Sequence, residues 1–243
     1  MTKFTRSILQ RGMAAAAVCL ALATPASASI YTITYTGTVD TGRDTTGYFF
    51  GDGQAHNLAG MAYRSTYTVN TAFGTTNSTA TSIVIAGGSV LSNTTPVVSA
   101  VLTINGTSTA AFAGEAVGFD SREHVPATPL DRVMTFVDRV DPGTLYEQAL
   151  SNSVESSINH FLSLLQLDAA FSYDVVPGDQ ESGDFRFKTA SLDARGHFTV
   201  SHVEVSQVVP EPATTALLAL SLGVGLGVRS VRRRRAHPTA QAS

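Results

Sequence analysis

The chain has 243 residues, a length that fits one domain of ordinary size or two small ones. Of its 16 Lys and Arg residues, three precede Ala28 and five follow Val209, so only eight lie in between, whereas the chain has 19 Asp and Glu. A segment this acidic repels nucleic acid and anionic membrane surfaces, so binding to either is disfavoured. The single cysteine is Cys19, so the chain after it has no disulfide, thiolate metal site or cysteine nucleophile.

The first 28 residues have the three parts of a secretory signal peptide. Basic residues come first, an apolar stretch spans residues 13–23, and Ala26-Ser27-Ala28 offers the small side chains of a cleavage site. We therefore expect export by the general secretion machinery and cleavage after Ala28. An uncleaved anchor is the alternative, although the apolar stretch is shorter than the roughly 20 residues that span a bilayer.

Residues 29–208 have the composition of a β-rich exported domain, with many Thr and Val residues punctuated by Gly and Asn. Residues 30–36 alternate apolar side chains with Thr, which predicts a strand with one buried face. Between Val200 and Val203 the apolar positions change phase, which predicts a β-bulge near Ser201 and His202. Further strands are predicted at residues 61–69, 82–86, 97–104, 132–140, 170–176, 185–192 and 198–205, and residues 71–81 are predicted to form a long loop or a poorly formed edge.

One segment of this domain has helical spacing instead. Its apolar residues recur at steps of three to five, and Thr144 with Glu147 three positions later fits a capping box. These apolar residues are Leu145, Ala149, Val154, Ile158, Phe161 and Leu165. We therefore predict one helix over residues 144–166. The expected fold is mainly β, an antiparallel β-sandwich or barrel-like domain with this one inserted helix.

Residues 209–235 consist of a short motif, an apolar stretch and a basic end, and a short polar tail, residues 236–243, follows them. The motif is Val209-Pro210-Glu211-Pro212, whose prolines keep the chain extended. The apolar stretch continues to Val228 and predicts a C-terminal transmembrane helix. The basic end comprises Arg229, Arg232, Arg233, Arg234 and Arg235, which the positive-inside rule keeps in the cytoplasm. A simple tail anchor behind an ordinary proline linker is the alternative.

This tail resembles the PEP-CTERM sorting signal, which occurs on exported proteins of Gram-negative bacteria that make exopolysaccharide and form biofilms. Pro210, Glu211 and Pro212 match the motif that names the family, and the apolar stretch and arginines match its other two parts. Residues 236–243 depart from the family, which usually ends at the basic cluster. The resemblance implies an exosortase, a membrane protease-transferase that recognises and removes the tail. It also implies an inner-membrane-anchored precursor that later reaches the cell surface or extracellular matrix.

The exported domain carries little that predicts chemistry. Asp40, Asp44 and Asp52 lie among glycines and are candidate calcium ligands, although a turn-rich strand connection explains them equally well. The sequence contains no serine-hydrolase elbow, metalloprotease motif, phosphate-binding loop or dinucleotide fingerprint, so we assign no catalytic residue and no other cofactor. The scattered histidines His56, His124, His160, His197 and His202 are predicted to be surface residues.

The leading hypothesis is therefore a non-enzymatic protein of the cell surface or exopolysaccharide matrix, with exopolysaccharide as a candidate partner. One alternative is a secreted hydrolase of polysaccharide or peptide with the same sorting tail. Another is a calcium-dependent adhesin.

Overall fold

The computed structural model describes residues 29–88, 94–111, 116–141 and 146–208. The predicted signal peptide, sorting motif, apolar stretch and basic end lie outside the described residues. The described residues contain no helix of the length and apolarity that crossing a bilayer requires.

Thirteen strands form the described structure. They are β1 (Ile30–Asp44), β2 (His56–Asn57), β3 (Ala62–Asn70), β4 (Thr75–Ser78), β5 (Ser82–Gly88), β6 (Val97–Ile104), β7 (Thr107–Ala111), β8 (Val117–Val125), β9 (Leu130–Asp141), β10 (Tyr146–Ser156), β11 (Phe171–Asp174), β12 (Gln180–Lys188) and β13 (Asp193–Val208). The fold is thus mainly β, as the sequence predicted.

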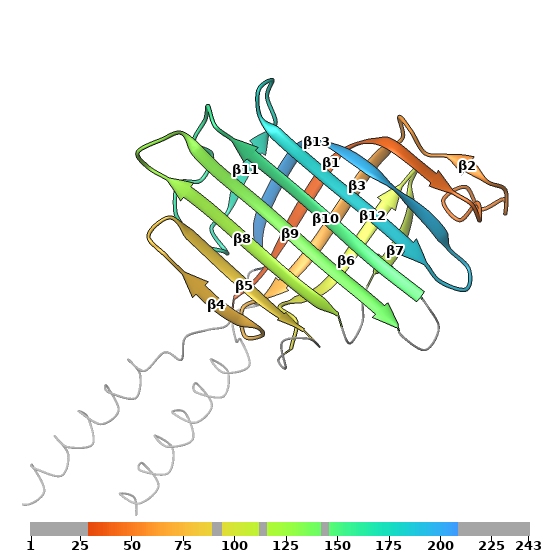
Figure 1. The fold of residues 1–243 in the computed structure, drawn as a ribbon, viewed down its shortest axis with the longest axis horizontal. Helices are drawn as coiled ribbons and strands as arrows, with labels where there is room; N and C mark the ends of the chain where they lie inside the picture. The colour runs from red at the N-terminus through yellow and green to blue at the C-terminus, as the bar shows by residue number, and fades with distance from the viewer. Residues whose placement is uncertain (1–28, 89–93, 112–115, 142–145, 209–243) are drawn as a thin grey trace, which may run out of the picture.

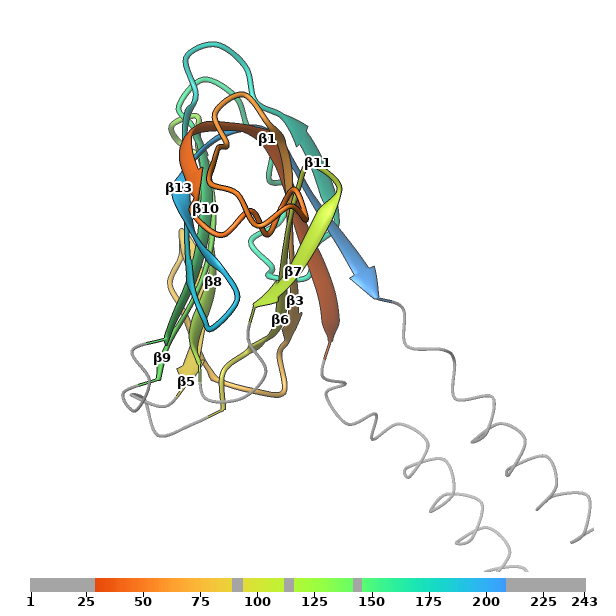
Figure 2. The same ribbon diagram turned by 90° about the vertical axis from the view of Figure 1, so that its right-hand side faces the viewer.

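The strands belong to one antiparallel sheet that curls over on itself. Its order is β4-β5-β8-β9-β10-β12-β13-β1-β3-β6-β7, with β11 beside β13 and β2 beside β1. Two runs of this order face one another: the first comprises β4, β5, β8, β9, β10 and β12, and the second comprises β1, β3, β6 and β7. Figure 1 shows the first run in front of the second, and Figure 2 shows the two runs from the side. The long strands β1 and β13 lie where the sheet bends between the runs.

A β-bulge helps these two long strands to bend. Thr36 pairs with His202 while the next residue, Gly37, pairs with Val200, so Ser201 is the extra residue on β13. A bulge increases the local twist and bends its strand. The predicted bulge near Ser201 and His202 is confirmed.

The inner faces of the two runs form the core. On β1, Tyr31, Ile33 and Tyr35 are fully buried, whereas the Thr residues between them are only partly buried. The Tyr31 hydroxyl donates a hydrogen bond of 2.8 Å to Asp120 on β8, and the Tyr35 hydroxyl lies 3.0 Å from Thr135 on β9. Polar groups of one run therefore bond directly to the other run inside the core.

A second polar group in the core joins β3 to β10. The side-chain carbonyl oxygen of Asn152 accepts hydrogen bonds from Ser65 at 2.6 Å and from Tyr67 at 2.9 Å. The amide nitrogen of Asn152 donates to the Tyr63 hydroxyl at 3.2 Å. Buried polar groups are costly unless bonded, so this group fixes how the two runs face each other.

The predicted helix over residues 144–166 is wrong. Residues 146–156 form β10, which pairs with β9 and β12 along its length, and the following residues form a loop. The inward positions 150, 152, 154 and 156 of β10 are Leu, Asn, Val and Ser. Because two of these four inward residues are polar, the alternation of apolar and polar residues that marks a strand is absent from the sequence. The apolar residues of the following loop happen to recur at helical spacing, which led to the wrong prediction.

The strand predictions were otherwise close. Strands lie within or across all eight predicted strand segments, although β12 spans residues 180–188 and the predicted segment was 185–192. The segment 71–81 holds the short strand β4, which is exposed and ends the sheet, as an edge prediction requires. The strands β2, β7 and β8 were missed.

Candidate functional site

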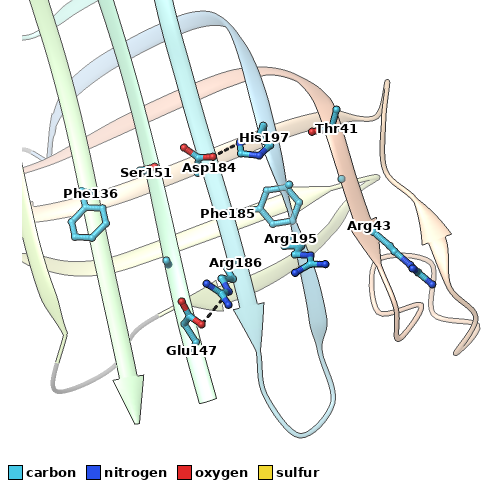
Figure 3. A pocket seen from close by; sticks show the side chains of 13 residues that line it. Thr41, Arg43, Phe136, Glu147, Ser151, Asp184, Phe185, Arg186, Arg195 and His197 are labelled. Atoms are coloured by element: carbon cyan, nitrogen blue, oxygen red, sulfur yellow. Dashed lines mark ion pairs between the residues drawn. The ribbon is translucent and has the colours of Figure 1, made fainter. Parts of the chain in front are cut away.

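The outer face of the sheet carries a trough of about 680 Å³ across β9, β10, β12, β13 and β1. Figure 3 shows its labelled side chains along these five strands, from Phe136 at one end to Arg43 at the other. Since neighbouring strands lie about 4.8 Å apart, the trough spans about 19 Å from β9 to β1. This width suits an extended chain better than one small molecule.

Strand alternation turns basic side chains toward the trough. On β12, Phe185 and Phe187 are buried, so Arg186 and Lys188 are exposed on the opposite face. On β13 the same alternation exposes Arg195.

Three arginines from adjacent strands form a single line, which we name the arginine row. Arg43 of β1 is the register partner of Arg195 on β13, and Arg195 is the register partner of Arg186 on β12. Like charges directly opposite each other on a sheet destabilise it. A fold that keeps three such charges in line carries a cost that a bound anion would offset.

The ion pairs near the arginine row neutralise only part of it. Arg186 pairs with Glu147 at 3.0 Å, and His197 pairs with Asp184. Among the described residues, neither Arg43 nor Arg195 has an ion pair with a carboxylate. With Lys188, the row holds four of the eight Lys and Arg between Ala28 and Val209, so the basic charge of an acidic domain is concentrated here.

An aromatic pair adjoins the other end of the trough. Phe136 of β9 lines the trough and is the register partner of Phe119 on β8. Their rings lie 5.4 Å apart, and both side chains are partly exposed. The trough thus combines arginines with an apolar ring face.

The three predicted calcium ligands are not brought together as one site. Asp44 is fully buried, and its carboxylate accepts hydrogen bonds from the N–H and hydroxyl of Thr46 and from the N–H of Phe49. Asp52 instead binds a nearby histidine ring, and Asp40 is exposed on β1. Asp44 thus organises the connection after β1, which is the turn-forming role that the sequence offered as the alternative.

Every histidine in the described part of the chain pairs with an aspartate. The pairs are His56–Asp52, His124–Asp131, His160–Asp131, His197–Asp184 and His202–Asp174. His197 and His202 pair with different aspartates. Two other histidines share one carboxylate, which the sequence did not reveal.

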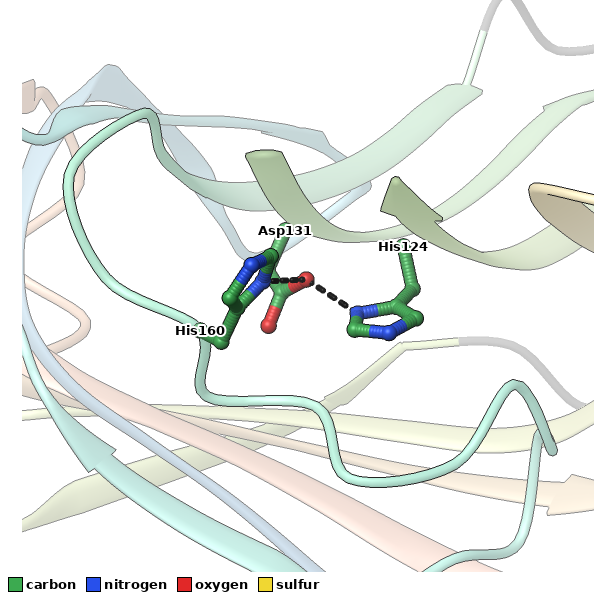
Figure 4. Close-up of side chains that lie close together, drawn as sticks. All are labelled: His124, Asp131 and His160. Atoms are coloured by element: carbon green, nitrogen blue, oxygen red, sulfur yellow. Dashed lines mark hydrogen bonds and ion pairs between the residues drawn. The ribbon is translucent and has the colours of Figure 1, made fainter. Parts of the chain in front are cut away.

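That shared carboxylate belongs to Asp131 (Figure 4). Its Oδ1 lies 2.6 Å from Nδ1 of His124 and 3.2 Å from Nδ1 of His160. Its Oδ2 accepts a 2.5 Å hydrogen bond from the N–H of Leu162. His124 is the cross-strand partner of Asp131 in the β8–β9 hairpin. Because β8 was not predicted from the sequence, this pairing could not be predicted either.

A buried ion pair lies inside the core. Arg122 and Asp120 form a 2.6 Å ion pair in which both side chains are fully buried. Asp120 also accepts hydrogen bonds from Tyr31 and Thr135. Burial raises the pKa of the Asp120 carboxyl, against the opposing effect of Arg122, and burial likewise raises the pKa of the Tyr31 hydroxyl. Because this group has no exposed surface, its role is structural.

No protein-family model, curated protein or solved structure matches this chain.

Proposed function

We propose that this protein is a non-enzymatic, exported protein of the cell surface or extracellular matrix that binds acidic exopolysaccharide along the arginine row. The observation that carries this proposal is the line of Arg43, Arg195 and Arg186 across three adjacent strands. The architecture we propose for the domain is a flattened, barrel-like sandwich, because the inner faces of the two runs bond across the core.

The spacing of the arginine row supports a repeating anion as its ligand. Guanidinium groups form paired, directional hydrogen bonds with carboxylates and sulfates, which are the anionic groups of acidic polysaccharides. The arginines recur at the strand spacing of about 4.8 Å, so successive charges of one chain can meet successive side chains. The partly exposed Phe136 offers an apolar surface to the same chain.

The state of the trough carboxylates favours binding over hydrolysis. A glycosidase needs two carboxyl groups free to act as acid and as base or nucleophile. Both carboxylates that line the trough are in ion pairs, Glu147 with Arg186 and Asp184 with His197. This arrangement supports the non-enzymatic proposal.

The route to the surface is proposed from the two ends of the sequence. The signal peptide through Ala28 directs export, and Val209-Pro210-Glu211-Pro212 with its apolar and basic parts resembles an exosortase signal. An exosortase-like protease is thus the expected processing partner, and the membrane-anchored form is the expected precursor.

Binding is tested with a soluble polyuronate, alginate, beside the neutral polymer dextran. Exposed ion pairs are worth up to about 1 kcal/mol each, so Arg43→Ser with Arg195→Ser is expected to weaken alginate binding about tenfold. Added salt should weaken wild-type binding by screening. The matched control is Arg64→Ser, an exposed arginine of β3 outside the trough. Equal binding of dextran, or no loss in the double variant, would refute the polysaccharide proposal.

Sorting is tested separately by cell fractionation in a host that has an exosortase. Wild type is expected to be shortened and to reach the surface, whereas a Glu211→Ala, Pro212→Ala variant is expected to stay full-length in the inner membrane. Full-length, membrane-bound protein in both cases would contradict the sorting proposal without affecting the binding result.

A further inference from the structure

None of the three residues His124, Asp131 and His160, which Figure 4 shows side by side, lines the trough. Within the described residues, they form the one group of three or more His, Cys, Asp or Glu whose ligand atoms all lie within 4.8 Å of one another. We propose that this cluster binds a divalent transition-metal ion, with zinc as the best fit. The bound ion ties the loop after β10 to the β8–β9 hairpin.

The three ligands come from three separate segments and converge on one point. His124 lies near the end of β8, Asp131 near the start of β9, and His160 in the loop after β10. Both Nδ1 atoms are directed at the same carboxylate oxygen, at 2.6 and 3.2 Å. Zinc bonds of about 2.0–2.2 Å hold tetrahedral ligand atoms roughly 3.3–3.6 Å apart. Admitting the ion therefore requires the closer imidazole to move by less than about 1 Å.

Asp131 is already oriented as a metal ligand. Its side chain is fully buried, and Oδ2 is held by the N–H of Leu162, which leaves Oδ1 facing the two imidazoles. A hydrogen bond to the outer oxygen of a ligating carboxylate fixes its direction and is a regular feature of metal sites. A buried carboxylate also needs a positive partner, and a divalent ion supplies one.

The histidines leave the site open to solvent. The side chains of His124 and His160 are 21% and 40% exposed, and their rings meet edge to face with centroids 5.1 Å apart. Among the described residues, no partner holds the Nε2 atom of either ring. Each ring can therefore carry its proton on Nε2 in water and present an Nδ1 lone pair to the ion. Water completes the coordination.

The donor types select the metal. Two imidazoles and one carboxylate suit zinc and neighbouring transition metals, whereas calcium and magnesium prefer oxygen ligands only. The site is distinct from the predicted calcium ligands, of which Asp40 and Asp44 lie on β1 and Asp52 lies in the connection after it.

The ion would act on the loop that carries His160. This loop is attached at Leu162 through Asp131 and at Leu167, whose carbonyl oxygen accepts a 3.3 Å hydrogen bond from Arg122. Leu162 and Leu167 are both buried, so the loop covers part of the core. A metal bond from His160 to the hairpin would hold this cover in place, and metal binding would stabilise the folded domain.

The test is zinc titration of the full chain, purified in detergent without a polyhistidine tag and stripped of metal. Isothermal titration is expected to give one zinc per chain. Zinc at about 100 times its Kd is expected to raise the Tm by about 5–11 °C. Cobalt in place of zinc should give visible absorption of a four- or five-coordinate site.

Two single variants identify the ligands without unfolding the core. Because both side chains are partly exposed, His160→Gln and His124→Gln are expected to fold, and each should weaken zinc binding at least roughly 100-fold, beyond the loss from a supporting residue. The matched control is His197→Gln, a histidine with one aspartate partner and 68% exposure, which should bind zinc like wild type. No zinc binding by wild type, unchanged binding in His160→Gln, or a loss in His197→Gln would overturn the proposal.

Discussion

Replacing Arg122 by methionine tests how the core is held together. The variant removes the guanidinium 2.6 Å from Asp120 and leaves that carboxylate fully buried without a positive partner. Breaking one side of a buried ion pair costs about 3–5 kcal/mol, because the remaining charge is uncompensated. At about 2–4 °C per kcal/mol for a domain of this size, the Tm should fall by about 6–20 °C.

The pH dependence of this cost follows from the Asp120 carboxyl. Burial raises its pKa in the folded protein above the unfolded value, and loss of Arg122 removes the main opposing charge. A group of this kind stabilises the fold most below its unfolded pKa, and that contribution is lost as pH rises through the folded pKa. The deficit of Arg122→Met relative to wild type should therefore be smaller at pH 5 than at pH 8.

The assay is urea unfolding followed by far-ultraviolet circular dichroism, since the chain has no Trp for fluorescence. The double variant Asp120→Asn, Arg122→Met removes both charges and should be more stable than Arg122→Met at pH 8, with little pH dependence. The surface control is Arg132→Met, whose 3.8 Å pair with Glu155 is partly exposed and should contribute at most about 1 kcal/mol. A deficit under about 1 kcal/mol for Arg122→Met, or no recovery in the double variant, would refute this reasoning.

Two other substitutions test the connections of the sheet. Asp44→Ala should lower the free energy of unfolding by about 1–3 kcal/mol because it leaves buried donors unbonded, whereas the exposed Asp40→Ala should stay within about 0.5 kcal/mol in the same urea assay. Gly37→Ala should destabilise by more than about 3 kcal/mol, because its Cβ would overlap the backbone carbonyl oxygen of Thr199 across the bulge. Its neighbour Thr38 is exposed, so a normal Tm for Thr38→Ala beside a lowered Tm for Gly37→Ala would support this, and equal Tm values would contradict it.

The sequence by itself determined the class of the fold, because a strand with one buried face leaves a local signature. In residues 30–36 the buried positions are uniformly apolar or aromatic, so the period of two is visible without any partner strand. The bulge at Ser201 was equally readable, since it shifts the phase of apolar residues within one strand.

Only the tertiary structure decided the identity of β10. Its inward residues Asn152 and Ser156 are polar, and their burial is tolerated because hydrogen bonds from other strands and from the following loop satisfy them. The partners of Asn152 lie 85 to 89 residues away in the sequence, so no local pattern indicates that this polar side chain is buried. The buried role of Asp120 was hidden for the same reason. Its ion partner Arg122 is near in sequence, but the Tyr31 hydroxyl that bonds to it comes from the opposite run.

The candidate sites divide in the same way. Alternation along one strand predicts that Arg186 and Lys188 share a face, but only the register of β12, β13 and β1 lines Arg186 up with Arg195 and Arg43. The cluster around Asp131 needs a hairpin and a loop to meet. Local periodicity determines which face of the sheet a side chain lies on. The arginine row and the histidine–aspartate cluster instead arise from pairings between separate segments, which only the folded sheet specifies.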